Sequence, residues 1–325
     1  MAIQQNQTPQ QFLTSLAVAY RPQDAHFIAN SVVPTVAVPG SNFAYMEFDT
    51  IMQRQLADNT RTVRRDGGGE GGVNYVSWEA TKQSGLTTEK IAASVVDVKD
   101  VEDFGQGVVD RQATRAVALH MLIQREQRAV DIFQTTGNYA SSSYYTTLSG
   151  TSQWSDFENS DPEQDVENGI TQIIKGYGQA PNTIIIPWEV AVYLKRHPMV
   201  KDVMIRDGGG SQSETFAGGE NLFGLPPVLF GLRVVVPKAA YVSSNPGLTE
   251  TQAFMWGKKV SIAHVNSSPS VDDPSFAYSF SSRTMQIMRG LYSRPEGGEY
   301  ISGVESTLEK VVADRGAYLI IDAVA

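Results

Sequence analysis

Phe43-Ala-Tyr-Met-Glu-Phe-Asp49 alternates aromatic or apolar side chains with small or acidic ones, and this two-residue period is typical of a β-strand. Val73-Asn-Tyr-Val-Ser-Trp-Glu79 alternates in a similar way. Between them lie the basic Arg61-Thr-Val-Arg-Arg65 and the stretch Asp66–Gly72, in which five of seven residues are glycine. A hairpin this long with a glycine-rich tip is marginal alone in water. We therefore expect it to need another surface, which we predict to be a second copy of the chain.

The composition is that of a globular protein and excludes several functions. The 325 residues are 41% hydrophobic and 19% charged, with a net charge of −9 and no cysteine. No basic domain stands out, so recognition of nucleic acid by phosphate neutralisation is not expected, and disulfides and thiolate metal sites are excluded. The N-terminus lacks a signal-peptide pattern, and no apolar run approaches the ~20 residues that span a bilayer. We expect a soluble protein made in the cytoplasm, with no membrane contact.

The strongest helical pattern in the chain runs from Gln112 to Gln134 and predicts a rod of roughly 30 Å. Asp110 is expected to cap its start. Glu126 interrupts its apolar stripe, and we expect this side chain to pair with neighbouring arginines. Before the helix, Lys90–Asp103 is rich in β-branched residues and predicts a strand.

The second half of the chain alternates helices with apolar strands, which is typical of an α+β or α/β unit. Ser160-Asp-Pro162 is expected to open a helix that runs to Gly176. At the C-terminus, residues 304–312 and 318–321 are expected to form a hairpin around the turn Asp314-Arg-Gly316. The other elements expected in this half are a polar connector at 138–160, strands at 183–186, 232–237, 253–256 and 259–265, and a helix at 189–196.

No motif for catalysis or for binding a metal or cofactor has the context that its chemistry needs. Gly67–Gly72 matches G-x-G-x-x-G, but a strand-like run follows it where a phosphate-binding loop needs a helix. We interpret these glycines as a mobile loop tip. The histidines have no metal-ligand spacing; they are His26, His120, His197 and His264. We therefore expect no catalytic residue, no cofactor and no metal site.

Two charged clusters allow a structural or a functional interpretation. The acidic run within Asp97–Asp103 does not fit a calcium loop, and we interpret it as a solvated strand end. The basic tip formed by Arg61, Arg64 and Arg65 is either a solvated loop that limits aggregation at a strand edge or a contact with an acidic patch on a neighbouring subunit. The net negative charge of the chain favours the subunit contact.

Two further stretches extend this picture. Val32-Val-Pro-Thr-Val-Ala-Val38 precedes the strand Tyr45–Asp49, and Pro181-Asn-Thr-Ile-Ile-Ile186 precedes Trp188, Leu194 and His197-Pro198. The first stretch resembles the entry to the extended loop, and the second the axial strand and helix, of tailed-bacteriophage major capsid proteins with the HK97-type fold. The resemblance covers essentially the whole chain and rests on the order of its segments.

The resemblance implies an α+β fold in four parts. These are an N-terminal arm (1–42), an extended loop (43–80), a peripheral domain (81–159 and 271–325, with a spine helix at 112–134) and a mixed α/β axial domain (160–270). It also implies that the extended loop lies over an adjacent subunit. The residues expected at that contact are Arg61, Arg64, Arg65, Glu70, Tyr75 and Trp78.

The function implied by the resemblance is structural and not enzymatic. The chain would self-assemble as pentamers and hexamers into an icosahedral phage head around double-stranded DNA, which it would contact weakly. A separate scaffold protein and a portal would take part in assembly in the host cytoplasm, and a decoration protein is a further candidate partner in the virion. Two alternatives stay open: an encapsulin-like compartment that encloses a cargo enzyme and, from another class, a nucleotide-binding enzyme that uses Gly67–Gly72.

Overall fold

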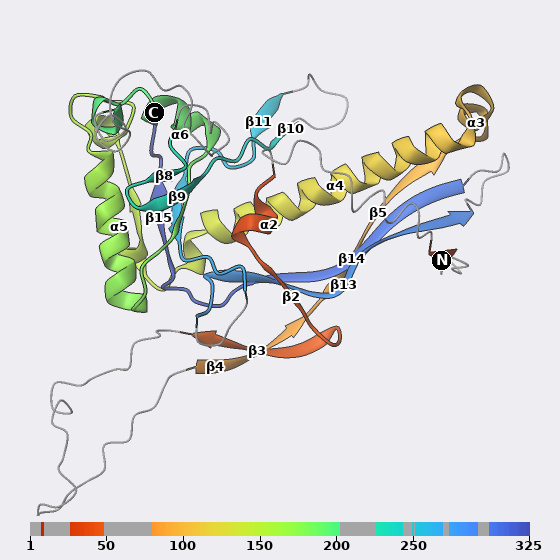
Figure 1. Ribbon diagram of the computed structural model, residues 1–325, viewed down its shortest axis with the longest axis horizontal. Helices are drawn as coiled ribbons and strands as arrows, with labels where there is room; N and C mark the ends of the chain where they lie inside the picture. The colour runs from red at the N-terminus through yellow and green to blue at the C-terminus, as the bar shows by residue number, and fades with distance from the viewer. Residues whose placement is uncertain are drawn as a thin grey trace, which may run out of the picture.

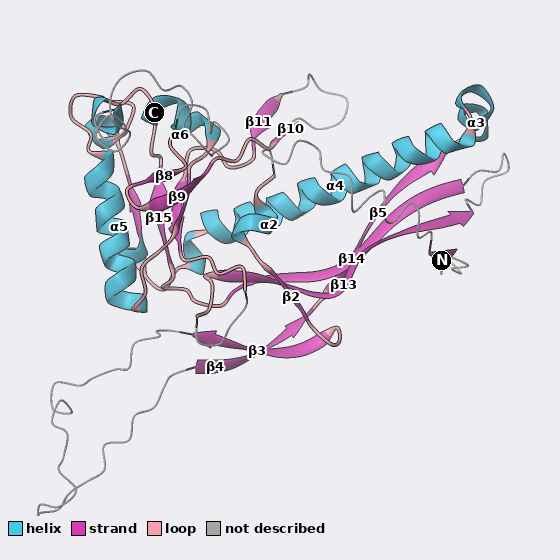
Figure 2. Ribbon diagram, viewed as in Figure 1, coloured by secondary structure: helices cyan, strands magenta, loops and turns pink. Residues whose placement is uncertain are grey.

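The computed structural model of the chain describes residues 8–9, 27–48, 80–201, 225–242, 249, 251–268, 273–291 and 299–325. The molecule is elongated, and one long helix, α4 (Gln106–Gln134), runs from one of its two larger sheets along the other (Figure 1). Helices and strands are mixed throughout, which confirms the α+β class (Figure 2). Within the described ranges, no helix is long and apolar enough to cross a bilayer.

The first unit, called the long unit below, consists of α4 and a five-stranded sheet, one face of which packs against α4. Its strand order is β1-β13-β14-β5, and β2 pairs with β13 as well. The strands are β1 (Thr8–Pro9), β2 (Thr35–Ala37), β5 (Thr88–Val96), β13 (Ala277–Leu291) and β14 (Glu299–Val311). Val117 and Met121 of α4 meet Ile287 and Ile301 in a buried cluster, and Gly303 lets the helix approach the sheet closely.

The second unit is a six-stranded mixed sheet with its own core. The strand order is β6-β15-β12-β7-β9-β8. The strands are β6 (Tyr145–Thr147), β7 (Thr183–Ile185), β8 (Val228–Leu229), β9 (Leu232–Val235), β12 (Val260–Ala263) and β15 (Ala317–Ile321). Two helices, α5 (Pro162–Tyr177) and α6 (Trp188–Leu194), contribute to the core on one face of the sheet. The expected start of α5 is confirmed, because the Asp161 side chain accepts a hydrogen bond from Gln164 N at 3.0 Å.

The remaining elements are small. The ribbon consists of β3 (Asn42–Phe48) and β4 (Ala80–Leu86), and a second pair consists of β10 (Ala240–Val242) and β11 (Gln252–Phe254). The short helices are α2 (Ala29–Val32), α3 (Val98–Phe104) and the 3-10 turns Thr136–Asn138, Ser142–Tyr144 and Gly150–Ser152.

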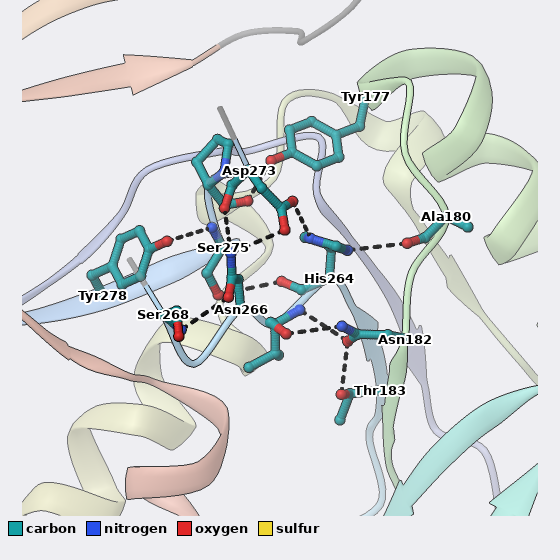
Figure 3. A network of polar contacts seen from close by, with 12 residues as sticks. Tyr177, Ala180, Asn182, Thr183, His264, Asn266, Ser268, Asp273, Ser275 and Tyr278 are labelled. Carbon is teal, nitrogen blue, oxygen red and sulfur yellow. Dashed lines mark hydrogen bonds and ion pairs between the residues drawn. The ribbon is translucent and has the colours of Figure 1, made fainter. Parts of the chain in front are cut away.

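The two large sheets are joined where the chain crosses between them. The connection from β12 to β13 and the return from β14 to β15 run together, because His264 N donates to Gly316 O and Val312 N donates to Phe276 O, both at 2.9 Å. Figure 3 shows the side chains that hold this crossing. The His264 ring contacts two acceptors, Ala180 O at 3.0 Å and Asp273 Oδ1 at 2.7 Å. The crossing is therefore a hydrogen-bonded joint and not a free linker.

Two predictions about the ends of elements were wrong. The segment after Val96 was expected to continue as a strand, but it forms α3, because the Asp97 side chain accepts from Lys99 N at 3.0 Å and starts a helix. The long helix starts at Gln106 and not at Gln112, directly after Gly105, whose φ is 82°. Asp110 therefore lies inside the helix, where it pairs with Arg289 Nη2 at 2.5 Å instead of capping.

The strand pairing also differs from the expectation in three places. β14 and β15 do not form a hairpin, because β14 pairs with β13 and β5 whereas β15 pairs with β12 and β6. The polar connector contains β6, which belongs to the six-stranded sheet. The partner of β3 is the strand at 80–86, and the expected return strand at 73–79 lies outside the described residues.

Candidate functional site

The base of the ribbon is built into the core of the long unit by aromatic side chains. Phe43 and Tyr45 of β3 lie against Phe280 of β13, with ring centroids 4.8 and 5.2 Å apart. Phe48, at the other end of β3, is buried with Val312, and its N–H donates to Val312 O at 2.7 Å. Aromatic contacts of this kind are strong and geometrically specific. The ribbon therefore leaves the body of the chain from a fixed position.

Thr87 fixes the corner at which the chain leaves the ribbon. The strand from Ala80 to Val96 pairs with β3 before Thr87 and with β14 after it. Thr87 N donates to Ser41 O at 2.8 Å, and its buried hydroxyl lies 2.7 Å from Ser282 Oγ and 3.0 Å from Ser306 Oγ. The backbone N–H and the hydroxyl of Thr87 are thus both hydrogen-bonded at the point where the chain passes from the ribbon to the five-stranded sheet. These bonds hold the corner in one conformation.

A partly buried ionic cluster continues from this corner toward α4. Glu309 Oε2 lies 3.0 Å from both Lys90 Nζ and Arg128 Nε, and Arg128 Nη2 lies 2.8 Å from Glu305 Oε1. Burial alone would raise the pKa of Glu309, but the charges of Arg128 and Lys90 outweigh it and hold that pKa below its ordinary value. The cluster thus ties together β5, β14 and the spine helix next to the ribbon.

A polar groove of about 740 Å³ opens beside this cluster. Tyr45 and Gln83 of the ribbon line one part of it, and Lys90, Arg128 and Glu309 line another. Pockets that bind small molecules are lined mainly by apolar side chains, whereas most side chains along this groove are polar or charged. The groove therefore resembles a contact surface more than an active site.

One carboxylate on α4 has a different environment. Glu126 is fully buried, and it accepts hydrogen bonds from Ile28 N at 3.0 Å, Ala29 N at 2.8 Å and Trp256 Nε1 at 2.6 Å. The expectation that it pairs with arginines was wrong. Sequence reasoning noticed the residue but not its partners, which lie 97, 98 and 130 positions away. The available signal was a single acidic side chain on the apolar stripe of a long helix.

Several large apolar side chains of the long unit face solvent. Leu86, Ile91 and Val95 are 62%, 55% and 56% exposed, and Phe104 at the end of α3 is 68% exposed. Ile91 and Val95 lie on β5, an edge strand of the five-stranded sheet in the described part of the chain. Exposed apolar residues along an unprotected edge are characteristic of surfaces that other chains cover.

The contact residues expected from the sequence lie outside the described residues. Arg61, Arg64, Arg65, Glu70, Tyr75 and Trp78 all belong to 49–79, as does the Gly67–Gly72 motif.

The other side chains singled out in the sequence have structural partners or lie on the surface. His120 is exposed beside Gln124, His197 lies 3.2 Å from Ser160 Oγ, and His264 belongs to the joint between the sheets, whereas His26 is not among the described residues. The acidic residues of α3 are solvent-exposed, as expected, but on a helix. Across the described ranges, no group of side chains could hold a metal ion.

A spine helix along a long sheet, an extended ribbon and a second mixed α/β sheet together define the HK97-type fold, as the resemblance implied. No protein-family model and no curated protein matches the sequence. The fold is therefore established by solved structures at low identity. A phage-related protein from Bordetella bronchiseptica is 19% identical, with a TM-score of 0.71 over 98% of this chain and 99% of that chain.

Two further structures with this fold are shells. The capsid of cyanophage P-SCSP1u matches at 10% identity and a TM-score of 0.59, over 93% of this chain and 89% of that chain. The SrpI encapsulin of Synechococcus elongatus matches at 9% identity and a TM-score of 0.51, over 100% of this chain and 94% of that chain. The fold is thus one that both phage capsids and encapsulins use.

Proposed function

We propose that the chain is a structural shell protein that self-assembles as pentamers and hexamers into the icosahedral head of a phage, around double-stranded DNA. The observation that carries this proposal is the ribbon. Its strand β3 is fixed to the body of the chain by aromatic contacts, and its two strands end at the paired residues Phe48 and Ala80, which are 32 positions apart in the sequence. A two-stranded ribbon is marginal on its own, whereas in a shell it adds a contact between subunits.

The exposed apolar side chains support the same proposal. Leu86, Ile91, Val95 and Phe104 would be costly to leave in water on a free monomer, and each becomes useful when a neighbouring copy covers it. The shell structures that share the fold add support from their own assemblies, a cyanophage capsid among them.

The segment between the ribbon strands is, in this proposal, the part that reaches the neighbour. Arg61, Arg64 and Arg65 would meet acidic groups on an adjacent copy, with Glu70, Tyr75 and Trp78 at the same contact. The chain carries a net charge of −9, so acidic surface is plentiful. Residues 1–42 would form an arm anchored to the body through α2 and β2, 81–159 and 271–325 a peripheral domain, and 160–270 an axial domain, with β6 and β15 of the peripheral ranges paired into the sheet of the axial domain. A scaffold protein and a portal would act during assembly in the host cytoplasm, before the virion is complete.

Electron microscopy and gel filtration of the expressed full chain test the proposed function. We expect large closed particles, or capsomers that close when a scaffold protein is supplied. A stable monomer that forms neither under any assembly condition would contradict the proposal. A monomer that binds a nucleotide would support the enzyme hypothesis based on Gly67–Gly72.

An encapsulin-like compartment is the second candidate, because the encapsulin of Synechococcus elongatus shares the fold over nearly the whole of both chains. The contents of particles purified from the native source distinguish the two functions. Double-stranded DNA supports the phage head, and a single enriched cargo protein supports the compartment.

Charge reversal of the loop tip tests the subunit contact. Replacing Arg61, Arg64 and Arg65 together by glutamate is expected to lower the yield of particles while each chain stays folded. Particles of the unmodified chain should loosen as salt rises, because exposed charge pairs are screened over about 10 Å at 0.1 M salt. Light scattering against salt concentration measures both effects. An unchanged salt response in the triple variant would remove the electrostatic part of the proposal.

A further inference from the structure

The carboxylate of Glu126 connects three parts of the chain that are far apart in sequence. Its Oε2 accepts from the backbone N–H groups of Ile28 and Ala29, and its Oε1 accepts from the indole N–H of Trp256. These partners belong to the start of α2 and to the turn after β11, whereas Glu126 itself lies in the spine helix. All three segments meet in one buried apolar cluster with Phe133 and Val130.

The contact with α2 is an N-cap supplied from another helix. Helices begin with N–H groups that lack an intrahelical acceptor, and a side chain near the start normally supplies one. The residue at the N-cap of α2 is Ile28, whose side chain cannot accept a hydrogen bond. Glu126 takes its place, so the short helix has its cap only while it lies against the spine helix.

No cation neutralises Glu126 within the described surroundings. Residues 27–33 contain no titratable side chain. On α4 itself, Arg125 Nη2 donates to Thr35 Oγ1, and Arg128 is paired with Glu305 and Glu309. From the turn after β11, Lys259 Nζ donates to Gln134 O at 3.1 Å. The anion is therefore held by three N–H dipoles alone.

We propose that Glu126 is the positioning residue for the N-terminal segment. Its carboxylate fixes where the chain enters α2, and it ties that entry point to the spine helix and to Trp256. The inference does not rest on the proposed function, because it concerns the fold of a single chain.

The titration of Glu126 separates this role from that of an ordinary core residue. Burial raises the pKa of Glu126, although the hydrogen bonds from Trp256, Ala29 and Ile28 oppose the rise. We call the state closed when Glu126 contacts Ile28, Ala29 and Trp256, and open when these contacts are lost and the carboxyl group meets water. A carboxyl group whose pKa is higher in the closed state than in water holds its proton more tightly there. Lowering the pH thus favours the closed contact, and raising the pH above 4.5, the ordinary value, through the raised pKa favours opening.

Hydrogen exchange on the unassembled full chain tests the proposal. We expect the protection of the Ile28 and Ala29 amides, corrected for intrinsic exchange, to fall as the pH rises through the pKa of Glu126. In Glu126→Gln the protection should no longer depend on pH in this way, and at low pH it should be about tenfold lower than in the unmodified chain, because the amide nitrogen of glutamine faces one of the three donors. Asp131→Asn, on the same helix but exposed, should behave like the unmodified chain.

A second variant tests whether the indole donor matters as the geometry requires. In Glu126→Gln combined with Trp256→Phe, the glutamine oxygen can accept from the two amides without opposing the indole N–H. We expect this double variant to regain part of the protection that Glu126→Gln loses.

Two results would overturn the proposal. One is a pH profile of Ile28 and Ala29 protection in Glu126→Gln that equals that of the unmodified chain. The other is a double variant whose loss of protection equals the sum of the losses in Glu126→Gln and in Trp256→Phe. The profile of the unmodified chain alone is decisive if Glu126→Gln does not fold, since protection independent of pH would contradict the proposal. Failure of particles to form would count against the proposed function and leave these readouts unaffected.

Discussion

Two buried carboxylates, Glu126 of the spine helix and Glu309 of the strand packed against it, are held in opposite ways. Glu309 lies 3.0 Å from two cationic groups, those of Lys90 and Arg128, and its pKa is lowered. Among the described residues, Glu126 faces only N–H donors, and burial raises its pKa. Both lose hydration on burial, so the difference comes from whether full charges or dipoles replace the water. Glu309 thus fastens the sheet to the helix most firmly as an anion, whereas Glu126 holds α2 at a cost that grows as it ionises.

The largest expected effect is the removal of the cation that serves both glutamates of the ionic cluster. Arg128→Met should destabilise the chain by about 3–5 kcal/mol, because breaking a buried pair leaves an uncompensated charge. Glu305 would lose the partner at 2.8 Å, and Glu309 would keep Lys90, one of its two cationic partners, together with the hydroxyls of Ser279 and Thr307. Urea unfolding of the unassembled chain at neutral pH measures the loss.

The matched control for this variant is Arg111→Met on the same helix. Arg111 is exposed, and its one hydrogen bond within the described residues goes to Gly107 O one turn before it, so its loss should change the free energy of unfolding by about 0.5 kcal/mol or less. If Arg128→Met costs no more than Arg111→Met, the cluster does not fasten the helix to the sheet.

A pH profile sharpens the comparison between the two carboxylates. Because the pKa of Glu309 is lowered in the folded chain, its contribution is complete above its unfolded value of 4.5 and is lost as the pH falls through the folded pKa. Glu309→Gln should cost about 1.5–3 kcal/mol at pH 7 and should flatten the loss of stability below pH 4.5. Glu126→Gln should flatten the profile above pH 4.5 instead. Urea midpoints between about pH 3 and pH 7 distinguish the two; identical profiles for both variants would remove the distinction.

Local patterns in the sequence were enough for elements with local causes. The start of α5 was predicted because Asp161 and Pro162 act on the next turn, and β3 was predicted because its alternation reflects one buried face. β13 was missed, because register shifts between Ser281 and Gln286 break the alternation of apolar and polar residues. Some of its polar side chains are also buried and hydrogen-bonded to the neighbouring strand, as Ser279 is to Glu309. α3 was taken for a strand because its two valines outweighed the cap at Asp97.

The site was harder to predict than the fold, because its contacts are distant in sequence. Lys90 and Glu309 are 219 residues apart, and Thr87 and Ser306 are also 219 apart. No period or motif in a single sequence records such pairs. The sequence did indicate that Glu126 was unusual, but the arginine partners expected for it are neighbours on the same helix, whereas the real partners come from other segments.

Gly303→Ala disturbs the same helix without touching a charge. A Cβ at Gly303 would lie 2.6 Å from Met121 Sδ and 2.8 Å from Val117 Cγ1, so these side chains, or the spine helix that carries them, would have to shift. Overpacking of this kind costs about 1–3 kcal/mol, and here the cost should not depend on pH. Gly107→Ala, which meets nothing within 4 Å in the first turn of α4, should be neutral or stabilising by up to about 1 kcal/mol. Calorimetry at two pH values compares them, and a pH-dependent loss in Gly303→Ala would show that packing and the ionic cluster are coupled.

The smallest expected effect concerns an ion pair that lies on the surface of the same sheet. Arg283 Nη1 lies 3.1 Å from Glu89 Oε1, but these side chains are 42% and 53% exposed. Water solvates both charges, so Glu89→Gln should cost about 1 kcal/mol or less, and added salt should abolish the difference from the unmodified chain. Urea unfolding with and without 1 M sodium chloride provides the measurement. A loss as large as that of Arg128→Met would mean that proximity of opposite charges, and not their burial, determines how firmly a carboxylate holds this sheet.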